Sequence, residues 1–106
     1  MASSFLKNMN IKIINRNFRC KIGEIDIIFR DKEYLVFGEV KYRNENHYGS
    51  PEEAVNVAKQ KKICRVSDYY RMINGVSEFT AVRFDVLAIN GNEIKWIKDA
   101  FPYRYK

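Results

Sequence analysis

The chain has 106 residues, a length that predicts a single domain over residues 1–106 with one core. It carries 19 lysines and arginines against 13 acidic residues, and this net charge of +6 favours a polyanionic partner such as nucleic acid, or else serves only solubility. Two cysteines and one histidine are too few for a disulfide framework or a zinc site, which predicts a reducing, cytoplasmic setting. No apolar run approaches the roughly 20 residues of a membrane span, so we expect no membrane partner.

The first 42 residues predict a short helix followed by three strands. Residues 3–8 have the pattern of the last turns of a helix that is too short to stand alone. Residues 11–20, 24–30 and 34–42 have the apolar patterns of strands, separated by two turns. The third strand is nearly all apolar, which is typical of a central strand covered on both faces.

The rest of the chain predicts a long helix and two more strands. Residues 50–53, Ser-Pro-Glu-Glu, combine an N-cap, a proline in the first turn and an acid three residues after the cap. We expect this helix to continue, with a break near Asn56, as far as Ile73. Strands are expected at residues 80–89 and 93–97, joined by a hairpin turn. This order of elements predicts an α/β sheet crossed by a helix.

Charged residues end the most apolar strand, where a charge is unfavourable unless it is paired or coordinated. Side chains alternate along a strand, so Glu39 and Lys41 share a face. A hairpin through residues 31–33 would set Asp26 close to Glu39. These acids and the carbonyl of Val40 are oxygen ligands of the kind that Mg²⁺ or Mn²⁺ binds. The grouping predicts a metal site that activates water against a phosphate, with Lys41 beside that water.

A glutamate and a lysine two residues apart at a strand end are also the pattern of an ordinary surface ion pair. Such a pair contributes under about 1 kcal/mol to stability. Taken alone, the triplet Glu39-Val40-Lys41 is therefore a weak signal of catalysis.

The order of several motifs is more specific than any one of them. Residues 23–28 (GEIDII), 35–37 (LVF) and 39–43 (EVKYR) resemble the core of the PD-(D/E)xK nuclease superfamily. With residues 49–55, 59–61 and 83–86 added, the chain resembles specifically the YraN family of small bacterial proteins, which is similar to archaeal Holliday junction resolvases. The likeness spans residues 11 to about 101. It implies a restriction-endonuclease-like fold, a mixed β-sheet with a flanking helix.

The resemblance also implies roles for individual residues. Asp26 matches the first acid of the motif, Glu39 the second and Lys41 its lysine. Gln60 matches a helix position that reaches toward the active site in related nucleases, with a polar residue at the core boundary as the alternative. Basic residues near the predicted site would contact phosphates: Arg43, Lys59, Lys61, Lys62 and Arg65. Tyr42, His47 and Tyr48 are candidates for stacking on an unpaired base, with core or loop packing as their commoner use.

Two positions depart from the family pattern. No acid precedes Glu24, so the glutamate that relatives carry on a longer first helix is missing and that helix is shortened. Gly38 stands where a β-branched residue is usual, which predicts a gap on the face opposite Glu39. Phe5 and Leu6 need burial and have few local partners, which makes the first residues a candidate surface for a homodimer.

Three functions remain open from the sequence. The first is a metal-dependent endonuclease that hydrolyses phosphodiester bonds in DNA, with branched or junction DNA as candidate substrates. The second is a nucleic-acid-binding module of the same fold with weak or lost catalysis. The third is a protein-interaction domain.

Overall fold

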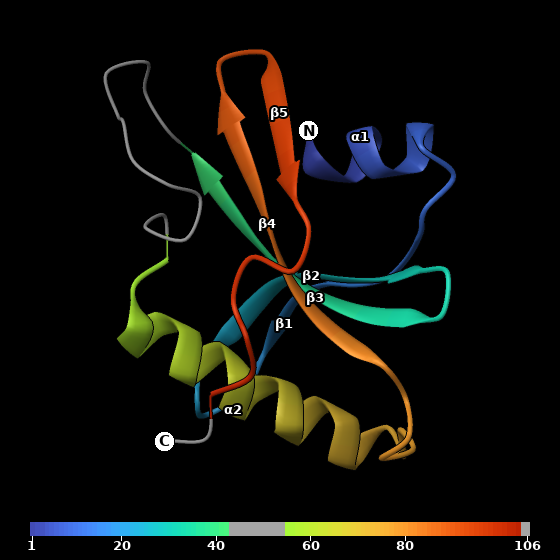
Figure 1. Cartoon of the computed structure of the whole chain (residues 1–106), viewed down its shortest axis with the longest axis vertical. Coiled ribbons are helices and arrows are strands. Elements are labelled where there is room, and N and C mark those ends of the chain that lie inside the picture. The colour runs from blue at the N-terminus through green and yellow to red at the C-terminus, as the bar shows by residue number, and fades with distance from the viewer. Residues whose placement is uncertain (43–54, 105–106) are drawn as a thin grey trace.

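The computed structural model describes residues 1–42 and 55–104. Its elements follow in the order α1 (Ala2–Asn8), β1 (Lys12–Arg19), β2 (Glu24–Asp31), β3 (Tyr34–Tyr42), α2 (Val57–Ile73), β4 (Val82–Asn90) and β5 (Glu93–Ile97) (Figure 1). The strands form one sheet in their chain order, and β3 and β4 are parallel while the other neighbours are antiparallel. The predicted α/β class and mixed sheet are confirmed, and they are consistent with a restriction-endonuclease-like fold.

The two helices cover opposite faces of the sheet (Figure 1). On one face, α2 and the segment after β5 bury a cluster that includes Phe37, Val66 and Phe84. On the other face, α1 buries Leu6 against Phe29 and its neighbours. Within the described ranges, neither helix is long and apolar enough to cross a membrane.

The second helix begins where the sequence predicts a break. Asn56 is its N-cap, and the side-chain oxygen of Asn56 accepts a hydrogen bond from the backbone N–H of Lys59 at 2.8 Å. The predicted helix start at residues 50–53 lies outside the described residues. Its predicted end is confirmed, because α2 ends at Ile73.

The first helix finds its partners within the same chain. Leu6 is fully buried, and the ring of Phe5 meets the ring of Trp96 edge-on at 6.5 Å between centroids. Phe5 and Leu6 are therefore buried by strands that are distant in the sequence, because β5 brings Trp96 over the face that α1 covers. The reason for expecting a dimer through this segment is removed.

The gap expected at Gly38 is also absent. A Cβ atom placed on Gly38 would lie 2.8 Å from Cγ2 of Ile27 and 3.3 Å from Cε1 of Phe29. Ile27 is paired directly with Gly38 across the β2–β3 ladder, and its branched side chain occupies the space that a larger residue would need. The prediction was wrong because the volume missing at Gly38 is supplied by the neighbouring strand.

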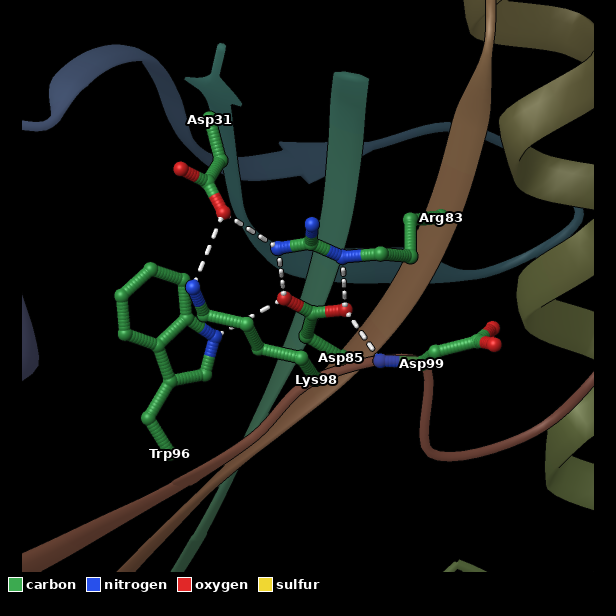
Figure 2. A network of polar contacts seen from close by, with 6 residues as sticks. All are labelled: Asp31, Arg83, Asp85, Trp96, Lys98 and Asp99. Atoms are coloured by element: carbon green, nitrogen blue, oxygen red, sulfur yellow. Dashed lines mark hydrogen bonds and ion pairs between the residues drawn. The ribbon is translucent and has the colours of Figure 1, made fainter. Parts of the chain in front are cut away.

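In a buried polar network on β4, Arg83 and Asp85 form an ion pair (Figure 2). Asp85 is fully buried, and its carboxylate accepts hydrogen bonds from Nε and Nη2 of Arg83 at 2.9 and 2.8 Å. It also accepts bonds from the indole N–H of Trp96 at 2.8 Å and the backbone N–H of Asp99 at 2.9 Å. Both oxygens are thus satisfied, as a buried charge requires.

Asp31, at the end of β2, joins the same network. Its Oδ2 atom lies 2.8 Å from Nη2 of Arg83 and 3.3 Å from Nζ of Lys98. Burial alone would raise the pKa of Asp31, but the hydrogen bonds and charges of Arg83 and Lys98 outweigh it and lower that pKa. In this part of the sheet, the two carboxylates of Asp31 and Asp85 are therefore balanced by the two cations Arg83 and Lys98.

Candidate active site

The β2–β3 hairpin brings the two predicted acids together. Ile27 pairs with Gly38, and the ladder ends there, so Asp26 and Glu39 are the next residues outward on adjacent strands. The Oδ2 atom of Asp26 accepts a hydrogen bond from the backbone N–H of Val40 at 2.8 Å. The Asp26 carboxylate therefore replaces a backbone partner at the point where the two strands separate.

Glu39 has the most unusual electrostatic environment among these residues. Its side chain is buried, with 8% of the residue exposed. Burial, a hydrogen bond with Asp26 and the negative charge of Asp26 raise the pKa of Glu39 to about 7, against the weaker opposing effect of Lys59. Glu39 therefore keeps its proton at pH values at which an exposed glutamate is already ionised.

The cation that reaches this pair is Lys59. Its Nζ atom lies 3.3 Å from Oε2 of Glu39, and its side chain is 44% exposed. Lys41 is exposed and forms no ion pair with any residue that the structure describes. The sequence had placed Lys59 among the phosphate contacts, and its pairing with Glu39 was missed. The available signal was topological: α2 connects two parallel strands, and a crossover helix begins near the carboxyl end of the strand before it.

Gln60 points into the protein rather than out of it. It is 3% exposed, its Nε2 atom donates to the carbonyl of Val55 at 2.8 Å, and its Oε1 atom accepts from Nε of Arg104. Within the described part of the chain, no hydrogen bond joins Gln60 to either acid. The geometry agrees with the alternative of a polar residue at the core boundary, which ties the start of α2 to the C-terminal segment.

The predicted phosphate contacts on α2 lie at its surface. Lys62 and Arg65 are exposed and Lys61 is half-buried. Part of Lys62 also has a packing role, because a Cβ atom on Gly23 would lie 3.1 Å from its Cδ atom. Arg43 lies outside the described residues.

The donor set at this site fits a hard divalent cation. Asp26, Glu39 and the carbonyl of Val40 offer only oxygen atoms, which Mg²⁺ and Mn²⁺ prefer. In the described part of the chain no three His, Cys, Asp or Glu side chains lie close enough to share an ion. An ion held here would therefore keep several water molecules, as Mg²⁺ usually does in proteins.

A small hollow adjoins the acid pair on the α1 side of the sheet. Its volume is about 290 Å³, and Asp26 and Val40 form part of its wall. The remaining wall comes from the start of α1 and from strands β1, β2 and β3: Met1, Ala2, Ser3, Arg16, Asn17, Ile27 and Tyr42. Asp26 therefore belongs both to the acid pair and to this hollow.

Glu24, on the same strand as Asp26, is a surface residue. Its carboxylate lies 3.0 Å from Nε of Arg19, and both side chains are largely exposed. The structure thus gives Glu24 an ordinary ion pair at the sheet edge.

Comparison with known proteins assigns the chain to a family. The model of the family described as "Uncharacterised protein family UPF0102" matches residues 1–89. A UPF0102 protein of Lachnoclostridium phytofermentans is 45% identical over 100 residues, covering 94% of this chain and 85% of the relative. A UPF0102 protein of Aliivibrio salmonicida is 47% identical over 103 residues, covering 94% and 84%. One of Photobacterium profundum is 48% identical over 99 residues, covering 91% and 79%. The chain belongs to the family UPF0102, the YraN family.

Proposed function

We propose that this chain is a metal-dependent endonuclease that hydrolyses phosphodiester bonds in DNA, with branched or junction DNA as candidate substrates. The observation that supports this most is the contact between Asp26 and Glu39 at the end of the β2–β3 ladder. Two acids at this depth repel each other, and the half-exposed ammonium of Lys59 neutralises only part of their charge. A divalent cation would complete the neutralisation.

In this proposal Asp26, Glu39 and the carbonyl of Val40 hold Mg²⁺ or Mn²⁺. The bound ion supplies Lewis acidity toward the phosphate and a water of lowered pKa. A ligating carboxylate must be ionised, so binding of the ion would release the proton of Glu39, whose pKa is raised in the metal-free chain. Lys59 keeps Glu39 oriented, and Lys41 is available to stabilise negative charge on the phosphate.

The remaining predicted residues position the site and the substrate. Gln60 anchors the first turn of α2, and this turn carries Lys59 toward Glu39. Further along the helix, Lys61, Lys62 and Arg65 offer positive charge to the DNA backbone. Such contacts follow the shape of the backbone and do not read its sequence.

A second candidate function is a nucleic-acid-binding module of the same fold without efficient cleavage. The net charge of +6 and the exposed cations of α2 support binding whether or not the acids hold a metal. Among the described residues, only two acidic side chains are placed to hold an ion at this site. A site with so few charged ligands favours this candidate, because it would bind a metal ion weakly.

A cleavage assay tests the first candidate. Labelled four-way junction, nicked duplex and single-stranded DNA are incubated with the protein in Mg²⁺, in Mn²⁺ or in EDTA. We expect cleavage only with a divalent ion, and a loss of at least about a hundredfold in Asp26→Asn and Glu39→Gln, since each removes a charged ligand.

Glu24→Gln is the matched control, because it removes one carboxylate from β2 at a surface ion pair. It should cleave like the wild type. Cleavage that persists in EDTA, or in both site variants, would refute the nuclease proposal. DNA binding in EDTA that weakens steeply with salt, without cleavage under any condition, would favour the binding module.

A further inference from the structure

We propose that the hollow beside Asp26 binds one unpaired nucleotide, with Arg16 on its phosphate and Tyr42 stacked on its base. The inference rests on the proposed function and names its substrate class: single-stranded or frayed DNA in preference to continuous duplex. Three features of the hollow carry it, namely its place, its unpaired guanidinium and its exposed aromatic ring.

The first feature is the place of the hollow. Asp26 lines it and also contacts Glu39, so a group bound there lies directly beside the acid pair. Its volume of about 290 Å³ lies just below the range of small-molecule sites, which is roughly 300–1,000 Å³. That size suits a ligand no larger than a single nucleotide.

The second feature is the guanidinium of Arg16. Arg16 faces Ile27 in the β1–β2 ladder and lines the hollow. Among the described residues it has no ion-pair or hydrogen-bond partner, although Asp26 lies in the same wall. Three residues further along the strand, Arg19 is paired with Glu24 at 3.0 Å. Arg16 is thus the arginine of β1 that is left available, and a planar guanidinium is well suited to phosphate oxygens.

The third feature is the ring of Tyr42. Tyr42 is 72% exposed at the end of β3, whereas Phe37 on the same strand is buried and Tyr34 is half-buried beneath Arg83. Core packing is therefore excluded for Tyr42. It lines the same hollow as Arg16. Aromatic rings beside backbone-binding cations are the usual platforms for unpaired bases.

Together these features predict a preference for unpaired DNA. A base inside a duplex must leave its stack before it can reach Tyr42, whereas a base in a single strand or a frayed end is already accessible. Removal of Tyr42 should therefore weaken binding to single strands far more than binding to duplex.

Fluorescence anisotropy in EDTA tests this without any chemistry. The probes are a labelled single-stranded oligonucleotide and a blunt hairpin duplex of the same charge. For the single strand, we expect Tyr42→Ala to weaken binding about tenfold and Tyr42→Phe to retain it. Arg16→Gln should weaken it several-fold and reduce the slope of log K against log salt by about 0.7, the loss of one phosphate contact.

Lys12→Gln is the charge-matched control, because Lys12 is an exposed cation of β1 outside the hollow. It should change single-strand affinity less than Arg16→Gln. Circular dichroism and thermal melting confirm that each variant is folded, as expected for exposed positions. The inference is overturned if Tyr42→Ala weakens single strand and duplex equally, or leaves both unchanged.

The two proposals fail in different ways. If no substrate is cleaved but the variants lose single-strand affinity as described, the nuclease proposal fails and the nucleotide subsite stands. If cleavage depends on Asp26 and Glu39 while Arg16→Gln and Tyr42→Ala bind and cleave as the wild type does, the subsite is overturned and the nuclease stands.

Discussion

Two pairs of carboxylates lie on the same sheet, and they differ in how far cations neutralise them. Asp31 and Asp85 share the guanidinium of Arg83, and Lys98, Trp96 and the backbone of Asp99 bring further donors to them (Figure 2). Asp26 and Glu39 face each other, and among the described residues the half-exposed Lys59 is the one cation that pairs with Glu39.

The two pairs differ in the direction in which the pKa of an acid is shifted. The pKa of Asp31 is lowered, because its cationic partners outweigh burial. The pKa of Glu39 is raised to about 7 by burial and by the neighbouring Asp26. A network with all its charges matched stabilises a fold, whereas an acid pair with charge left over is where a cation can bind.

The largest effect is expected from breaking the matched network. Arg83→Met leaves Asp31 and Asp85 buried without their shared cation, and should lower the free energy of unfolding by about 3–5 kcal/mol. Urea denaturation measures this. Arg19→Met, which removes the exposed partner of Glu24, is the control and should change stability by less than about 1 kcal/mol. Equal effects of the two substitutions would contradict the distinction.

Removing a charge from the pair Asp26 and Glu39 should stabilise the fold, in contrast to removing Arg83 from its network. The pKa of Glu39 is about 7 in the folded chain and near its model value of 4.5 when unfolded, so the folded state holds the proton more tightly. Stability is therefore lost as pH rises from about 4.5 to 7, and ionised Glu39 destabilises the fold above that window. In EDTA at pH 8, Glu39→Gln should be more stable than the wild type by up to roughly 3 kcal/mol.

Measurements of Glu39→Gln at low pH provide the control. Below about pH 4 both states of the wild type hold the proton, so the stability difference between Glu39→Gln and the wild type should shrink toward zero. Urea denaturation at several pH values gives the curve. A stability difference that does not vary with pH would show that the pKa of Glu39 is not raised in the folded chain.

A smaller effect is expected at Gly38, where β2 and β3 are in close contact. Gly38→Ala places a Cβ atom 2.8 Å from Cγ2 of Ile27 and should lower the free energy of unfolding by about 1–2 kcal/mol. Adding Ile27→Ala, which removes that methyl group, should make Gly38→Ala less harmful than it is alone. If Gly38→Ala costs the same in both backgrounds, Ile27 is not what limits the size of residue 38.

Sequence patterns predicted local features well. The bounds of β3 and β5 match the expected strands, and Asp26 was expected beside Glu39 because one short hairpin connects them. Local apolar alternation and turn residues are sufficient for such features.

Contacts between residues far apart in the chain could not be predicted from the sequence patterns. Lys59 reaches Glu39 only because the connection between β3 and β4 returns α2 to the strand end, and Phe5 meets Trp96 from the opposite end of the chain. The occupied space at Gly38 depends on one branched side chain of the adjacent strand. Each of these depends on packing between elements that the hydrophobic pattern of either element does not reveal.

Calorimetric titration of the metal-free protein with Mn²⁺ shows whether Asp26 and Glu39 hold a metal ion. We expect one ion per chain and a release of protons near pH 7 as Glu39 ionises. Binding should be lost in Asp26→Asn and Glu39→Gln but not in Glu24→Gln. Binding that both site variants retain, or no binding by the folded wild type, would contradict this expectation.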